Sequence, residues 1–60
     1  MLECEITRNG ILYYAVEKGK TDSINGRFYD NVEEAYSDTC KFLRNAGIGF
    51  CLIVPAALYE

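Results

Sequence analysis

The chain has 60 residues, of which 50% are hydrophobic and 25% are charged, and its formal net charge is -3. This balance is typical of a single folded domain and argues against intrinsic disorder. The negative charge argues against direct binding to nucleic acid or anionic membranes, because both depend on clustered Lys and Arg. A domain of this size buries only about 60% of its unfolded surface, so oligomerisation often adds burial.

The sequence predicts a cytoplasmic protein. The first residues lack the basic and apolar regions of a signal peptide, and the apolar run near the end is shorter than the roughly 20 residues of a membrane-spanning helix. The chain has 3 cysteines, an odd number, and no C-x-x-C pair, as expected of a reducing compartment. Because histidine is also absent, we expect no metal site. The cysteines are expected to be small buried hydrophobic residues: Cys4, Cys40 and Cys51.

The N-terminal quarter of the chain predicts a β-hairpin. Asn9-Gly10 separates two runs with the apolar, aromatic and β-branched residues of strands. This dipeptide is a strong hairpin signal, because both central residues of a type I′ turn need positive φ. A loop of these two residues predicts that Ile6 faces Tyr13. One face then carries Cys4, Ile6, Arg8, Ile11, Tyr13 and Ala15, and the other carries Glu3, Glu5, Thr7, Leu12, Tyr14 and Val16.

Residues 17–29 are rich in turn formers and predict a loop, with a short extra strand at 27–29 as an alternative. The loop contains three basic residues, Lys18, Lys20 and Arg27. A small enzyme or ligand-binding fold that uses this loop is one functional alternative.

An amphipathic helix is predicted to begin at Asp30 or Asn31. Each is followed three residues later by a glutamate, which is the capping-box pattern, and the acidic first turn suits the helix dipole. Gly47 supplies a typical helix stop. The apolar stripe of the helix is Val32, Ala35, Tyr36, Thr39, Cys40, Leu43 and Ala46.

Residues 48–59 carry no charge, and residues 50–54 are apolar at every position. This pattern predicts a third strand that is covered on both faces, ending near Pro55. The chain is therefore expected to be a single α+β domain over residues 1–60. Its order is β-β-α-β, with an antiparallel hairpin, one helix packed on one sheet face and a C-terminal strand.

We expect no catalytic residue and no cofactor, and hence not an enzyme. The serines lie in no nucleophile motif, and a cysteine nucleophile would lack its usual imidazole partner.

The second sheet face is the first candidate for function. One helix covers one face, so the other is expected to meet a second copy of the chain or a partner protein. Tyrosine is enriched at such recognition surfaces. Association through a sheet edge is one alternative, and cover of the face by the chain's own loop or C-terminal tail is another. The predicted interface consists of Leu12, Tyr14, Val16, Cys51 and Ile53.

The outer side of the helix is the second candidate. Its acidic residues would imitate nucleic-acid phosphate and block the basic groove of a host DNA- or RNA-binding enzyme. These residues are Asp30, Glu33, Glu34 and Asp38.

The size, acidity, tyrosine content and element order resemble in kind the short accessory proteins of phages and mobile elements, which bind and inhibit host enzymes. This resemblance implies a non-enzymatic interaction or regulatory module with a host protein as partner. The helix start at residues 29–35 also looks like the D-x-x-E-E-A helix entry of HicB-type antitoxins. We infer no residue roles from that short likeness.

Overall fold

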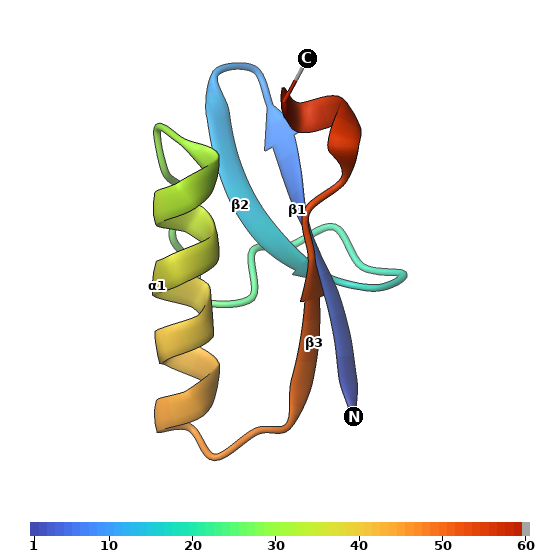
Figure 1. Cartoon of the computed structure of the whole chain (residues 1–60), viewed down its shortest axis with the longest axis vertical. Coiled ribbons are helices and arrows are strands. Elements are labelled where there is room, and N and C mark those ends of the chain that lie inside the picture. Colours follow the sequence, from blue (N-terminus) through green and yellow to red (C-terminus); the bar gives the residue numbers. More distant parts are fainter. Residues whose placement is uncertain (60) are drawn as a thin grey trace.

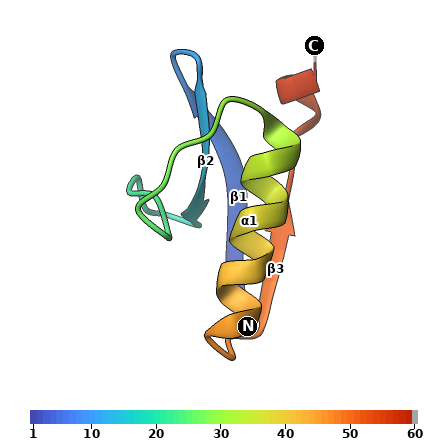
Figure 2. The ribbon, with the colours of Figure 1, turned by 90° about the vertical axis from the view of Figure 1, so that its left-hand side faces the viewer.

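The computed structural model describes residues 1–59 and confirms the predicted α+β fold. The strands form one sheet in the order β2-β1-β3, so β1 is central, antiparallel to β2 and parallel to β3. The helix lies across one face of this sheet (Figures 1 and 2). The elements are β1 (Leu2–Asn9), β2 (Leu12–Glu17), α1 (Val32–Asn45), β3 (Phe50–Ile53) and the short 3-10 helix η1 (Ala56–Tyr59).

The hairpin turn lies one residue later than predicted. Asn9 pairs with Leu12, so the central residues of the turn are Gly10 and Ile11. Gly10 has a φ of 66°, whereas no non-glycine residue of the described chain has a positive φ. These angles indicate a type II′ turn, which needs glycine only at its first central position. Ile6 therefore pairs with Ala15, two residues beyond its predicted partner, and a shift by two leaves every side chain on its predicted face.

The helix begins as the capping-box pattern indicates, and Asn31 is the N-cap. Its side-chain oxygen accepts a hydrogen bond from the Glu34 backbone N–H at 2.7 Å. Its side-chain amide donates to the Glu34 carboxylate at 3.4 Å. These contacts satisfy a backbone donor that the first helical turn leaves free.

The helix ends in a Schellman motif. The N–H of Ile48 donates to the Leu43 carbonyl and that of Gly47 donates to the Arg44 carbonyl, both at 3.0 Å. Gly47 has a φ of 72°, in the left-handed region that this motif requires. The predicted glycine stop is confirmed. The Ile48 N–H is hydrogen-bonded within the helix cap, so it is not free to bond to another strand.

The core lies between α1 and the inner face of the sheet. The predicted helix stripe is buried except for Tyr36, which is 41% exposed, and Ala46, which is exposed at the C-cap of the helix. The prediction of three buried cysteines was wrong for Cys51, which lies on the open face of β3. The buried residues are Cys4, Ile6, Ala15, Val16, Tyr29, Val32, Ala35, Thr39, Cys40 and Leu43.

The segment between β2 and α1 runs along the free edge of β2. Tyr29 exchanges two backbone hydrogen bonds with Tyr13, each at 2.8 Å. Ser23 forms a second isolated bridge with Val16. The alternative of an extra short strand is therefore reduced to two single bridges. Because of these bridges, the outer edge of β2 is paired. On the other side of the sheet, β3 is the outermost strand.

Candidate interaction surface

The outer face of the sheet, opposite α1, carries all five residues of the predicted interface, but it does not bring them together. The central strand β1 separates them with acidic and polar side chains. Glu5 pairs with Val16 on one side and with Ile53 on the other. The apolar residues of β2 and β3 therefore form two separate groups, with carboxylates between them.

The group on β2 is covered by the chain itself. Val16 is only 5% exposed, although it lies on the outer face. Phe28 of the preceding loop packs edge-on against Tyr14, with ring centroids 4.8 Å apart and an interplanar angle of 62°. Leu12 is half-buried. The chain's own loop, the alternative cover for this face, thus covers the part of the outer face that β2 forms.

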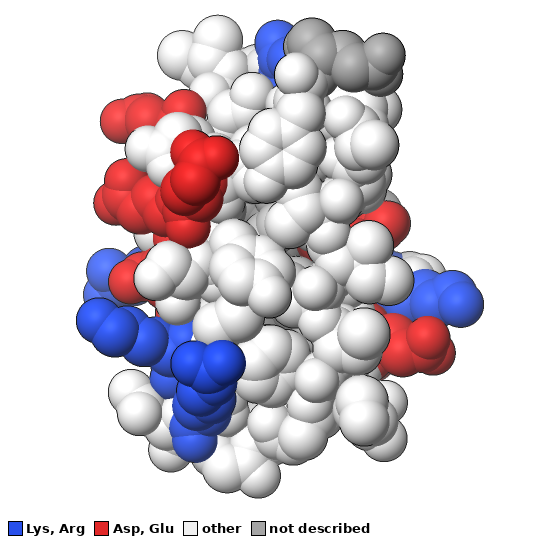
Figure 3. Space-filling view, in the orientation of Figure 1, with Lys and Arg blue, Asp and Glu red and all other residues white. Residues whose placement is uncertain are grey.

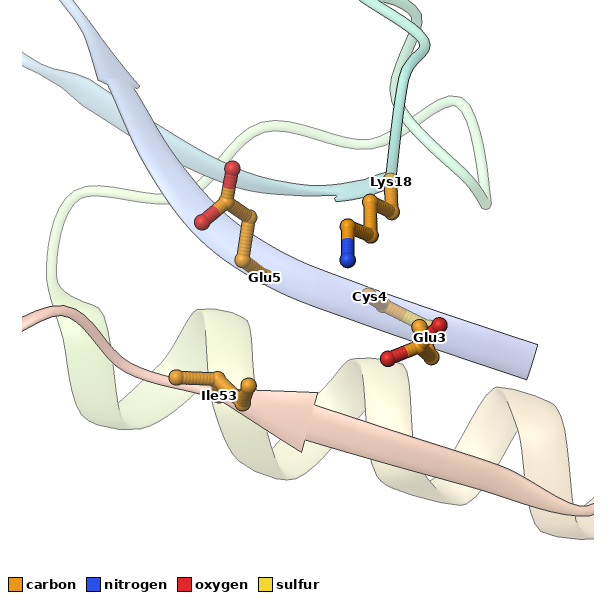
Figure 4. Close-up of a pocket in the computed structure, with 5 residues that line it drawn as sticks. All are labelled: Glu3, Cys4, Glu5, Lys18 and Ile53. Atoms are coloured by element: carbon orange, nitrogen blue, oxygen red, sulfur yellow. The ribbon is translucent and has the colours of Figure 1, made fainter. Parts of the chain in front are cut away.

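The group on β3 is open. Cys51 is exposed and Ile53 is 55% exposed. Ile53 borders a hollow of about 160 Å³ on the outer face, and the amino group of Lys18 lies over β1 between the carboxylates of Glu3 and Glu5 (Figure 4). Cys4, whose side chain is buried, also lines the hollow. Its burial, with a smaller contribution from Glu17, raises the pKa of the Cys4 thiol, so this cysteine stays protonated near neutral pH.

The free edge of β3 has backbone groups that no strand in the described chain pairs with. The N–H of Leu2 donates to the Gly49 carbonyl at 2.9 Å, so that carbonyl points toward β1. In a strand, the N–H and C=O of one residue point to the same edge, and successive residues alternate between the two edges. The N–H and C=O groups of Phe50 and Leu52 therefore point away from β1. Since β3 is outermost in the sheet, these groups are available to another strand.

The surface around this edge is uncharged. Figure 3, which looks onto the β3 side of the molecule, shows a white band over β3 and the segment that follows it. Charged side chains lie over α1 on one side of the band and at the opposite margin on the other. The large apolar side chains exposed among residues 48–59 are Ile48 (43%), Ile53 (55%) and Tyr59 (63%).

The acidic residues at and after the start of α1 are not equally exposed. Asp30, Glu33 and Glu34 are exposed near the start of the helix. Asp38 is half-buried and accepts a hydrogen bond from the Tyr29 hydroxyl. Figure 3 shows acidic atoms over the first part of α1 and basic atoms over the part that follows. The helix surface is therefore divided by charge along its length.

A hydrogen-bonded chain that the sequence patterns did not predict ties the loop to the helix. The Tyr29 hydroxyl donates to Asp38 at 2.7 Å and accepts from the Asn25 side-chain amide at 3.0 Å. Burial, followed by the bond to Asp38, raises the pKa of Tyr29. The contact joins residues nine positions apart through a side chain, so only the folded loop makes it evident.

The basic residues of the loop are dispersed. Lys18 lies at the outer-face hollow, and Lys20 pairs with Glu17 at 3.6 Å. Arg27 lines a second hollow, of about 290 Å³, between the loop and α1. That hollow also contains Asp38, whose charge opposes a phosphate ligand. The remaining lining residues are Asn25, Lys41, Phe42 and Asn45.

No protein-family model, curated protein or solved structure matches this chain. Within residues 1–59, no group of three or more His, Cys, Asp or Glu side chains is placed to hold a metal ion. The described part of the chain has no helix of the length and apolar character needed to cross a membrane.

Proposed function

We propose that this chain is a non-enzymatic protein interaction module that associates through the β3 side of its sheet. The observation that carries this proposal is an open strand edge within an uncharged band of exposed apolar side chains. Unpaired backbone donors and acceptors beside apolar side chains are the features through which extended segments add to sheets.

The contrast between the two sheet edges supports the proposal. On β2, the chain covers its own edge with the bridges of Ser23 and Tyr29. Monomeric proteins commonly protect an edge strand with charged residues, proline or a bulge. Residues 48–54 contain no charged residue and no proline, and Pro55 follows only after β3 has ended. This edge therefore has no charged side chain or proline that would oppose pairing.

The proposed biological role is regulation of a host protein by a small homodimer, in keeping with the resemblance in kind to phage and mobile-element accessory proteins. The homodimer is the part of the proposal that can be tested without knowing that partner.

The test compares Ile53→Lys with Ile11→Lys. Ile53 is 55% exposed on β3, and Ile11 is 81% exposed at the hairpin tip. Both variants add one positive charge, but only Ile53→Lys puts it at the proposed interface. Sedimentation equilibrium should show self-association that is at least about tenfold weaker in Ile53→Lys and unchanged in Ile11→Lys. Equal association constants for the two variants would reject the β3 side as the interface.

A further inference from the structure

We propose that two copies of this chain join their β3 edges antiparallel about a two-fold axis at Leu52, which gives one continuous six-stranded sheet. The inference rests on the proposed function and adds the occupant of the edge and its register. Both copies then carry α1 on the same face of the joined sheet, because directly opposed residues of an antiparallel pair share a face.

The hydrogen-bonding edge restricts the possible registers. Only residues whose N–H and C=O groups point away from β1 can form hydrogen-bonded pairs with the second copy. These residues are Phe50, Leu52 and, if the strand continues one residue, Val54. An axis at Leu52 pairs Leu52 with its copy and Phe50 with Val54 of the other copy. Phe50 and Val54 pair twice, once in each direction, and each hydrogen-bonded pair exchanges two bonds. This register therefore forms about six backbone hydrogen bonds. It uses no proline N–H.

The neighbouring registers are poorer. An axis at Cys51 would pair Ile48 with Val54, but the Ile48 N–H already donates to the Leu43 carbonyl in the helix cap. An axis at Ile53 would pair Phe50 with Ala56, which belongs to η1 and not to an extended strand. With α1 and η1 intact, each of these two registers keeps two hydrogen-bonded pairs and about four backbone hydrogen bonds, so the Leu52 axis, with about six, forms the most of the three.

The side chains suit a second copy of the chain. On the outer face, exposed Cys51 lies directly opposite the exposed Ile53 of the other copy, and each covers the other. On the inner face the opposed residues are also apolar. The carboxylates of Glu3 and Glu5 on β1 are three inter-strand spacings from those of the other copy, about 14 Å, which exceeds the Debye length of about 8 Å at physiological ionic strength. Repulsion between these carboxylates is therefore weak across the edge.

Because the band is uncharged, a second copy of the chain can approach it without like-charge contact between the two bands. A chain of this length also benefits from the extra burial that a second copy provides. The two-fold pairing supplies that burial where the exposed apolar residues of β3 lie.

Disulfide trapping of Ile53→Cys tests the register. In the proposed dimer, residues 51 and 53 of opposite copies form a non-hydrogen-bonded pair. Their Cα atoms are about 4.5 Å apart, within the range of about 4.4–6.8 Å for disulfides. Residues 51 and 51, or 53 and 53, are diagonal neighbours about 7–8 Å apart and beyond that range. Under mild oxidation, Ile53→Cys should form covalent dimer at least about tenfold faster than the wild-type chain.

The double variant Cys51→Ser/Ile53→Cys is the matched control, and it should cross-link as slowly as the wild-type chain. Circular dichroism of the reduced variants verifies the fold, and light scattering gives their mass before oxidation. Rapid cross-linking of the wild-type chain would instead indicate an axis at Cys51 and overturn the register. A non-covalent dimer whose three forms all cross-link slowly would reject the edge pairing but leave the interaction module standing. A monomer by light scattering at all concentrations would reject both this dimer and the homodimer of the proposed function.

Discussion

Replacing Tyr29 by phenylalanine removes the hydroxyl oxygen through which the loop is hydrogen-bonded to α1. The ring is 7% exposed, and its hydroxyl is bonded to both Asp38 and Asn25. Phenylalanine fills the same space, so the substitution tests these two hydrogen bonds without opening a cavity in the core.

The expected cost is about 2 kcal/mol in the free energy of unfolding. A hydrogen bond to a charged group contributes about 1.5–3 kcal/mol, and one between neutral groups about 0.5–1.5 kcal/mol. Asp38 and Asn25 are half-buried, so water replaces part of what they lose, and the total falls below the sum. In a domain of this size, a loss of about 2 kcal/mol lowers Tm by about 8–16 °C.

The assay is urea unfolding followed by circular dichroism at one fixed protein concentration, because self-association makes stability depend on concentration. Tyr36→Phe is the matched control, since Tyr36 is 41% exposed and its hydroxyl bonds to no described residue. It should change stability by less than about 0.5 kcal/mol. In a double-mutant cycle, Asp38→Asn should cost less in the Tyr29→Phe background than in the wild-type chain. Equal effects of Tyr29→Phe and Tyr36→Phe would refute the reasoning.

Three further outcomes follow from the local geometry. The pKa of Tyr29 is raised in the folded chain, so above about pH 10 the unfolded chain loses this proton first. The stabilisation is therefore complete below about pH 10, and the stability difference between the wild-type chain and Tyr29→Phe should shrink as the pH rises above that value. Asn31→Ala should lower the free energy of unfolding by about 1 kcal/mol, at least twice the loss from Asp30→Ala, and equal losses in urea titrations would contradict the cap. Thr39 is fully buried with no hydrogen-bond partner for its hydroxyl among the described residues, so Thr39→Val should raise the melting temperature by an amount equivalent to about 1 kcal/mol, and a lower melting temperature would count against this account.

The helix could be predicted from the sequence because its boundaries depend on neighbouring residues. Asn31 and Glu34 are three positions apart, and Gly47 needs only its own φ to end the helix. The assignment of side chains to sheet faces was also predictable, because alternation is a property of each strand alone. The hairpin turn was misplaced because Asn-Gly favours a type I′ turn, whereas the chain uses glycine in a type II′ turn.

The candidate surface was only partly predictable. The exposure of Cys51 and Ile53 follows from the parity of β3, which the continuous apolar run leaves undetermined. The cover over Tyr14 and Val16 comes from a loop whose position depends on Phe28 and Tyr29. Such contacts join residues that are distant in sequence and have no periodic pattern. The strand order, which makes the uncharged strand an open edge, is likewise a property of the whole fold.

The most direct test of the proposed interaction module is the molar mass of the wild-type chain by light scattering coupled to size-exclusion chromatography over a wide range of concentrations. The account predicts a species of twice the chain mass of 6.8 kDa that dissociates on dilution, because β3 of each copy completes the sheet of the other. A mass of 6.8 kDa at every concentration would contradict self-association through the β3 edge.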